Sequence, residues 1–507
     1  MFPLLTTITF LPLLGGIALL FLPKNQVGVI RWTALGIAGV DLLLALILLL
    51  TYSQSNVSAT FAGTFLFTEK LMWIPSLGIN YSLGVDGISV LLVVLTSLLT
   101  PICILASFNI EQKVKNYMAF MLLLECGIIG VFVATNLFLF YIFWELMLIP
   151  AYFLVGSWGG PRRIYAAFKF VLFTSVGSLI MLAGVIAIGY YHQLAAGGGY
   201  TLELSSLLNT KLDSGVQMWL LLAFAAAFAV KVPFVPFHSW LPDAYSEAPA
   251  PVTAMLAGAM SKTGAYGFLR FCIPLFPQAV QTLAPLFNTL AVISIIYCAI
   301  LALTQTDMKR LLGYSSISHL GVVMLGMFAF NVQGAEGSVL QMVNHGITTA
   351  ALFLIVGFIE QRTGTRRISD FGGMAARVPV LATVMLIAVL SSLGLPGLNS
   401  FAGEFLAFLG AFRSSVVFGT LGTIVVVPAA WYLIRFFQGV MEGTRNAAAV
   451  AGKRKGAFSD IGLREFLAIS PLLLLIFYIG LQPWPLTAIL EPSVISTLQN
   501  LGNAFVR

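Results

Sequence analysis

Long apolar stretches separated by short polar connections follow one another along almost the whole chain. A helix needs about 20 apolar residues to cross a bilayer, and the pattern predicts about fourteen such helices. Their approximate ranges are 2–22, 30–52, 84–106, 115–134, 136–156, 166–191, 216–237, 251–274, 279–303, 309–330, 338–360, 380–412, 415–440 and 464–486. The pattern therefore predicts an all-α, polytopic membrane protein that forms a single membrane domain over residues 1–507.

Two of the predicted helices are interrupted. The seventh carries Lys231 as its only Asp, Glu, Lys or Arg, and Pro233 and Pro236 break it just beyond this charge. The twelfth is unusually long and is broken by a Leu-Pro-Gly sequence that begins at Leu395, ahead of its only charge, Glu404. Discontinuous helices at membrane depth are where transporters build ion sites. The two breaks therefore predict that this protein moves ions.

The positions of the breaks also predict an internal repeat. The broken helices 7 and 12 are fourth in the blocks of helices 4–8 and 9–13, and an offset of five helices inverts orientation. We therefore predict two inverted five-helix repeats, over 115–274 and 279–440. Helices 1–3 precede them within 1–110, and helix 14 follows at 464–486.

Two other segments affect the expected topology. The longest connection, about 53–83, is expected to be an extramembrane loop. The beginning of the chain, MFPLLTTITFLPLLGG, has no positively charged n-region, so we expect a retained first helix and not a cleaved signal.

Composition agrees with a membrane location: 59% of the residues are hydrophobic and 9% are charged. The net charge of +7 does not indicate nucleic-acid binding, because 19 of the 26 Lys and Arg lie at the odd-numbered connections between predicted helices. That asymmetry is the positive-inside pattern, and it predicts that both termini face away from the cytoplasm. We expect a bacterial cell (inner) membrane, with a thylakoid membrane as the alternative. The basic cluster Lys453–Lys455 is expected to be a cytoplasmic loop that is solvated or contacts lipid headgroups.

Ionisable groups inside predicted helices are the candidate site, because charges in a bilayer are costly and usually functional. The candidates that would relay protons are Glu145, Lys231, Lys262, His319, His345 and Glu404. Three accessory candidates are His238, Glu125 and Asp86. A purely structural ion pair between Glu145 and Lys231 is the alternative reading, although buried pairs stabilise weakly. The two intrahelical histidines could equally be satisfied core residues.

Cofactor chemistry is not expected in this chain. The four cysteines, Cys103, Cys126, Cys272 and Cys298, stand alone in apolar segments, whereas iron–sulfur clusters need grouped thiolates. Neither a GxxxxGK[ST] phosphate loop nor a GxGxxG fingerprint after a strand occurs. The energy for transport must therefore come from an ion gradient or from a partner.

Several long segments resemble one family. They are KVPFVPFHSWLPDAYSEAPAPVTAMLAGAMSKTGAYGFLRF, LFLFYIFWELMLIPAYFLVGSWGG, DMKRLLGYSSISHLG, VNHGITTAALFLIVG and SSLGLPGLNSFAGEF. Together they resemble the antiporter-like membrane subunits of respiratory complex I, the proton-translocating NADH:quinone oxidoreductase. Glu404, where sister chains usually carry lysine, and an ending soon after helix 14 are typical of the M-type subunits (chain 4).

The resemblance implies roles and partners. Glu145 and Lys231 would be a coupled pair, Lys262 and the nearby histidines the central connection, and Glu404 the outlet. The partners would be the L-type and N-type antiporter-like chains, small membrane subunits and lipid, with FMN, iron–sulfur clusters and the quinone site in partner subunits. A subunit of a multi-subunit sodium/proton antiporter or of a membrane-bound hydrogenase is the alternative. Sodium sites favour oxygen ligands, and the sequence has no dense group of intramembrane carboxylates.

Overall fold

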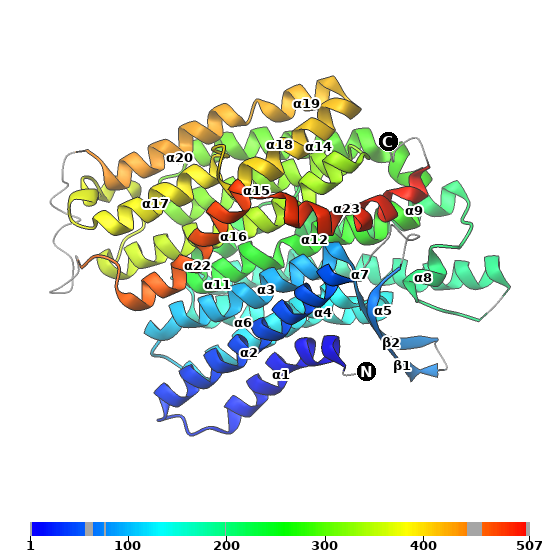
Figure 1. Cartoon of the computed structure of the whole chain (residues 1–507), viewed down its shortest axis with the longest axis horizontal. Helices are drawn as coiled ribbons and strands as arrows, with labels where there is room; N and C mark the ends of the chain where they lie inside the picture. The colour runs from blue at the N-terminus through cyan, green and yellow to red at the C-terminus, as the bar shows by residue number, and fades with distance from the viewer. Residues whose placement is uncertain (1–2, 56–63, 76–77, 198, 444–458, 503–507) are drawn as a thin grey trace.

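The computed structural model describes residues 3–55, 64–75, 78–197, 199–443 and 459–502. These residues form an elongated bundle whose helices run roughly along its long axis (Figure 1). Within this part of the chain, 11 helices are long and apolar enough to cross a membrane. The predicted all-α membrane fold is confirmed, whereas the count of fourteen spans and the inverted repeats stay predictions.

The N-terminal part combines four helices with a small sheet. Its elements are α1 (Leu4–Phe21), α2 (Val27–Gln54), β1 (Leu66–Ile74), β2 (Ile79–Val85), α3 (Gly87–Ala106), η2 (Ser107–Asn109) and α4 (Val114–Val133). The strands pair antiparallel, with Leu66 opposite Val85 and Ile74 opposite Ile79. The connection expected to be a loop therefore contains a β-hairpin. Glu69 of β1 accepts hydrogen bonds from the backbone N–H groups of Leu5 and Thr6, so the hairpin caps the first turn of α1.

The middle of the chain contains the first broken helix. Its elements are α5 (Leu137–Leu146), α6 (Leu148–Trp158), α7 (Arg163–Ala196), α8 (Leu204–Leu207), α9 (Ser214–Lys231), α10 (Trp240–Glu247), α11 (Ala250–Met255), η3 (Leu256–Met260), α12 (Lys262–Gly267), η4 (Phe268–Cys272) and α13 (Ile273–Leu275). Here η3 and η4 are π-helical turns. The predicted helix 216–237 therefore stops earlier, at Lys231, and the helix resumes as α10.

The C-terminal part contains the second broken helix. Its elements are α14 (Pro277–Thr304), α15 (Met308–Met327), α16 (Val332–Thr363), η5 (Ile368–Asp370), η6 (Met374–Ala376), α17 (Pro379–Ser392), α18 (Asn399–Ser414), α19 (Val416–Thr423), α20 (Val426–Met441), α22 (Leu463–Leu481), α23 (Trp484–Leu498) and η7 (Gln499–Leu501). The basic cluster 453–455 lies outside the described residues.

The last helix runs further than predicted. The range 464–486 ends just inside α23, which continues to Leu498 after a short interruption at Pro483. Proline cannot continue the hydrogen-bond ladder of the preceding helix, so α22 ends before it. Ser493 of α23 accepts a hydrogen bond from the backbone N–H of Gly87 at 2.8 Å, which fastens this helix to the beginning of α3.

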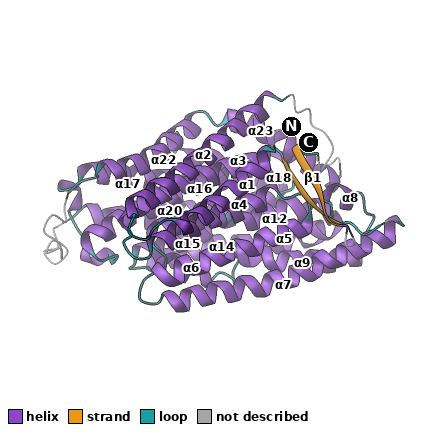
Figure 2. Ribbon diagram, turned by 90° about the horizontal axis from the view of Figure 1, so that it is seen from below, coloured by secondary structure: helices purple, strands orange, loops and turns teal. Residues whose placement is uncertain are grey.

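Helix α16 lies at the centre of the bundle. Its most apolar stretch is completely buried, and it packs against α15, α18, α11, α22 and α23. The beginning of α1, the end of α23 and the hairpin lie at one end of the bundle (Figures 1 and 2). The beginning of α1 and the end of α23 therefore lie at the same end of the bundle.

Candidate functional site

The first break leaves Lys231 at the C-terminus of α9. The break exposes backbone groups that the fold then satisfies with side chains: Trp240 Nε1 donates to the Val230 carbonyl at 3.0 Å, and the Val235 N–H donates to Ser294 Oγ at 3.0 Å. Non-helical backbone at membrane depth is tolerated only where it is satisfied in this way. The hydrogen bonds therefore stabilise the break as an ordered part of the bundle.

Lys231 itself is fully buried, and its Nζ atom has no hydrogen-bond partner among the described residues. The nearest polarisable groups are aromatic, because Nζ lies 5.4 Å from the centroid of the Trp144 ring and 5.5 Å from that of Phe170. Ring faces attract a cation without accepting its proton. They therefore leave the amine free to exchange its proton with another group.

Glu145 does not form the expected direct contact with Lys231. No ion pair within 4.0 Å joins the two residues, and Glu145 Oε1 has no hydrogen-bond partner within the described chain. The carboxylate is nevertheless close enough to interact electrostatically with the ammonium group. The structural ion-pair reading is therefore not supported, since a structural pair would be in contact.

Lys262 begins α12 between the two π-helical turns. Its Nζ atom donates to the Ala257 carbonyl at 2.5 Å and to Ser261 Oγ at 3.2 Å, and it lies 2.7 Å from His345 Nδ1. Single π-turns inside α-helices are frequent at functional sites, because the wider turn changes which groups a side chain can reach. The π-turn η3 here brings the lysine back onto the Ala257 carbonyl, five residues earlier.

The site continues from His345 as a row of polar groups that are in contact or nearly so. The rings of His345 and His319 have centroids 5.8 Å apart, and His319 Nδ1 lies 2.7 Å from Glu404 Oε1. Ser316 Oγ is 3.2 Å from His345 Nε2, and Gln341 Nε2 donates to Glu404 Oε1 at 2.9 Å. We call Lys262, His345, His319 and Glu404 the polar row.

The second break lies beside Glu404. Gly394 and Gly397 have φ angles of +79° and +91°, a backbone conformation that glycine adopts without steric cost. A Cβ atom at Gly394 would lie 3.2 Å from Glu404 Oε2, so the backbone of the break approaches the carboxylate closely. Asn399 spans the gap, because its Oδ1 accepts from Ser391 at 2.6 Å.

Lys231 lies next to the polar row but is not hydrogen-bonded to it. Helix α12 packs against α9 at Gly264, where a Cβ atom would lie 3.0 Å from Lys231 Cβ. The structure thus brings four of the six predicted residues into one row, and α9, which ends at Lys231, packs against α12, which begins at Lys262. Glu145 lies on α5. Among the described residues, it forms no hydrogen bond or ion pair with His319 or His345.

The three accessory candidates lie elsewhere. Asp86 caps α3 and forms an ion pair with Arg270, with Oδ1 2.6 Å from Arg270 Nη2. Arg270 is buried on η4, inside the predicted helix 251–274. Glu125 is fully buried beside Asp41, between α4 and α2. His238 is half-buried in the first break, with its ring 5.6 Å from that of Tyr297.

Other polar groups near the candidate site were not identified from the sequence. Gln341 and Ser316 contact the polar row, and an ion-pair cluster lies at the opposite end of the bundle from the hairpin. In that cluster Asp243 accepts from Lys169 and Arg310, at 2.8 Å each. The spacing of Gln341 and His345 along α16 places both on one helix face, and this signal could have identified the glutamine.

The fold and the site together define a polytopic, ion-translocating membrane protein of the antiporter-like class, with ionisable groups aligned through the interior of the bundle. Comparison with known families specifies this class. The family described as "NADH:quinone oxidoreductase/Mrp antiporter, TM" matches residues 134–427, and "NADH-ubiquinone oxidoreductase chain 4, amino terminus" matches residues 36–135. The chain belongs to this family of antiporter-like membrane subunits.

Individual relatives match over nearly their whole length. "NADH-quinone oxidoreductase subunit M" of Rickettsia bellii is 38% identical over 504 residues, which are 98% of this chain and 98% of the relative. The protein of the same description in Rhodobacter capsulatus is 39% identical over 509 residues, covering 98% of this chain and 96% of the relative.

Solved structures share the fold. A chain of "Respiratory complex I from Thermus thermophilus with bound NADH" superposes with a TM-score of 0.86 at 32% identity, covering 98% of this chain and 100% of that chain. A chain of the Mrp complex from a Dietzia species has a TM-score of 0.80 at 23% identity, covering 98% of this chain and 52% of that chain, which shows the fold alone.

Proposed function

We propose that this chain is the M-type, proton-translocating membrane subunit of an NADH:quinone oxidoreductase, and that the polar row carries the protons. The observation that supports the proposal most directly is the contact between Lys262 and His345, together with that between His319 and Glu404. Proton transfer needs donor and acceptor within hydrogen-bond reach, about 2.6–3.2 Å or one water further.

Lys231 acts as the switchable base of this proposal. A buried amine without an anionic partner favours losing its proton, and a nearby carboxylate favours keeping it. When the charge or position of Glu145 changes, the proton of Lys231 moves across the α9–α12 contact toward Lys262. From there it passes through His345 and His319 to Glu404 and then leaves the bundle.

The chain's own residues move only protons in this scheme. FMN, the iron–sulfur clusters and the quinone site belong to partner subunits, alongside L-type and N-type chains. The four cysteines are fully buried on α3, α4, η4 and α14, and they fit the packing of small apolar groups.

The decisive experiment is purification of the chain from its native membrane with identification of the subunits that accompany it. Flavin and iron–sulfur subunits are expected. If subunits of a sodium/proton antiporter or of a hydrogenase accompany the chain instead, the proposal is wrong and the chain is a subunit of that complex.

The orientation is part of the proposal. The excess of Lys and Arg at odd-numbered connections supports termini on the non-cytoplasmic side of a bacterial inner membrane. A cysteine introduced at residue 454 is expected to react with an impermeant thiol reagent only from the cytoplasmic side. Reaction from outside in intact cells would reverse the orientation.

A further inference from the structure

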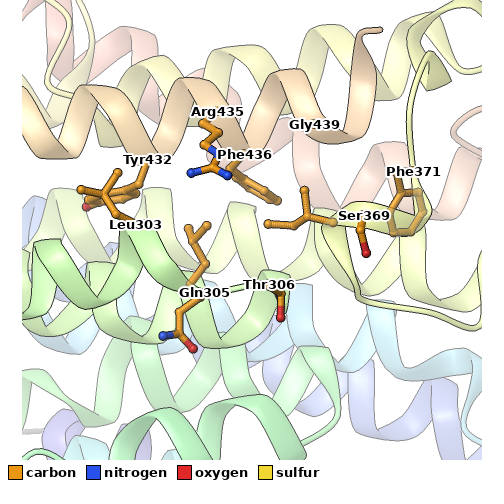
Figure 3. Close-up of a pocket in the computed structure, with 11 residues that line it drawn as sticks. Leu303, Gln305, Thr306, Ser369, Phe371, Tyr432, Arg435, Phe436 and Gly439 are labelled. Carbon is orange, nitrogen blue, oxygen red and sulfur yellow. The ribbon is translucent and has the colours of Figure 1, made fainter. Parts of the chain in front are cut away.

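A cavity of about 340 Å³ opens between α14, α15, α20 and the segment around η5 (Figure 3). At about 30 Å³ for each water, it has room for on the order of ten water molecules. Its polar lining includes Gln305, Thr306 and Ser369, and the exposed Arg435 of α20 borders it. The cavity lies at the α14–α15 connection, the end of the bundle opposite the hairpin.

Tyr432 joins this cavity to the interior. Its ring lines the cavity, yet the residue is only 1% exposed. Its hydroxyl group lies inside the bundle, 2.8 Å from Ser315 Oγ. A tyrosine therefore separates the cavity from a buried serine, and its hydroxyl can both donate and accept a hydrogen bond.

Ser315 leads to the polar row. Ser315 and His319 are four residues apart on α15 and therefore lie on the same helix face. His319 uses Nδ1 to contact Glu404, whereas its Nε2 atom is buried and has no hydrogen-bond partner within the described chain. A buried polar atom without a partner is costly, so it calls for a water molecule or a transient donor.

We propose that this cavity is a water-filled proton entrance that serves the Glu404 end of the polar row through Tyr432 and Ser315. The inference rests on the proposed function, to which it adds an entrance at the Glu404 end that pumping requires together with the step at Lys231. It also makes Tyr432 a proton-conducting residue in a helix that carries no ionisable group of the row.

The transfer keeps every hydroxyl group neutral. A water proton bonds to the Tyr432 oxygen while the tyrosine passes its own proton to Ser315 Oγ, and the aqueous phase outside the cavity returns a proton to that water. Ser315 in turn passes its proton, through one water, to His319 Nε2, which becomes N–H. Glu404 accepts the proton that His319 then releases from Nδ1, so one proton has moved and each oxygen keeps one hydrogen.

The chain offers a matched control. Tyr117 and Ser107 form another buried tyrosine–serine pair, with their hydroxyl oxygens 2.9 Å apart, on α4 and η2 away from the polar row. Tyr432→Phe and Tyr117→Phe delete the same hydroxyl group in the same kind of setting. Only the first deletion interrupts the proposed route.

The main test measures proton pumping in vesicles that contain the assembled complex. Tyr432→Phe and Ser315→Ala are expected to lower the rate by at least about tenfold, the scale of a lost proton-transfer group. Tyr117→Phe and Ser107→Ala are expected to pump normally. Normal pumping by both Tyr432→Phe and Ser315→Ala would overturn the entrance.

Lys231→Ala is measured in parallel. If it also pumps normally, the proposed function fails. If it alone is defective, only the entrance fails.

A second test asks whether water reaches the cavity, and it does not depend on the activity of a Tyr432 variant. Thr306→Cys is expected to react with a charged, impermeant thiol reagent added from the side of the α14–α15 connection, and the reaction is expected to slow pumping. The four native cysteines are fully buried, so background labelling is low. Thr282→Cys, exposed near the other end of α14, should react only from the opposite side. Protection of Thr306→Cys by lipid or by a neighbouring subunit would overturn the entrance.

Discussion

The centre of the bundle and its hairpin end both bury charged groups, but they treat those groups differently. At the hairpin end the buried Arg270 is well satisfied: it contacts Asp86 at 2.6 Å and also donates to Ser89 and Tyr266. In the centre, Lys231 Nζ has no hydrogen-bond partner within the described chain. An arginine paired with a carboxylate stays charged, whereas a buried lysine that no carboxylate contacts can change its protonation state at lower cost.

The difference predicts two separable phenotypes. Removing a satisfied charge leaves its partner unpaired and lowers stability. Removing an unsatisfied charge in the centre takes away a proton carrier and should cost little stability. The aromatic rings around Lys231 and the glycine-rich break beside Glu404 thus keep the central groups buried without fixing them.

The largest effect is expected for Lys231→Ala. The variant should assemble, because Nζ makes no hydrogen bond that would be lost. Proton pumping should fall by about 10²-fold or more, since a proton-transfer group has been removed. Quinone reduction and pumping are to be measured in membrane vesicles, with the exposed Lys211→Ala as control. Wild-type rates and proton stoichiometry in Lys231→Ala would show that the unsatisfied charge is not a carrier.

Glu404 lies between the two extremes, because His319 and Gln341 both contact its Oε1 atom. Glu404→Gln keeps the shape but cannot change charge, so pumping should be almost abolished. Glu404→Lys keeps a titratable group and should be milder. Gln341 Oε1 has no partner in the described structure, so this amide can turn to accept from the new ammonium. Both variants are to be compared for pumping in vesicles, and normal pumping by Glu404→Gln would make Glu404 structural.

The central features that the sequence could predict are those with a strong one-dimensional signal. An isolated charge in an apolar stretch and a proline beside it identified Lys231 and its break, and a Leu-Pro-Gly break identified the surroundings of Glu404. The same reasoning placed His319 and His345 in helices but could not bring them together. Their contact depends on how α15 and α16 pack, which the apolar pattern of either helix does not encode.

Other features carry no such signal. The π-turns around Lys262 keep an apolar sequence and differ only in hydrogen-bond register, so the periodicity does not reveal them. The ion pair between Arg270 and Asp86 joins residues that are distant in sequence, so the apolar pattern does not reveal it. The contact between Tyr432 of α20 and Ser315 of α15 likewise joins residues that are distant in sequence. Long-range pairs such as these are decided by packing.

At the hairpin end, Arg270→Met should lower stability and spare pumping. It leaves Asp86 buried without a cation, and breaking a buried pair costs about 3–5 kcal/mol. The thermal unfolding temperature of the purified complex should fall, while pumping per assembled complex stays near normal. Adding Asp86→Asn should restore part of the stability, since asparagine also caps a helix. A pumping defect that persists after this rescue would place Arg270 on the proton route. It would also show that buried charges at the hairpin end and in the centre do not have separate roles.

The smallest effect is expected for Glu69, whose carboxylate caps α1 from the hairpin. Glu69→Ala removes the acceptor for the N–H groups of Leu5 and Thr6, and loss of such a cap costs about 1 kcal/mol. Hydrogen exchange in the first turn of α1 should become faster, with pumping unchanged. Glu69→Gln keeps one acceptor oxygen but loses the charge that favours the helix N-terminus. Hydrogen exchange in this variant should therefore be faster than in the wild type and slower than in Glu69→Ala. Lys70→Ala is the control, because its side chain is 59% exposed and its contact with Glu203 is long, at 3.6 Å. Equal exchange rates in all three variants would show that the hairpin does not hold α1 through this carboxylate.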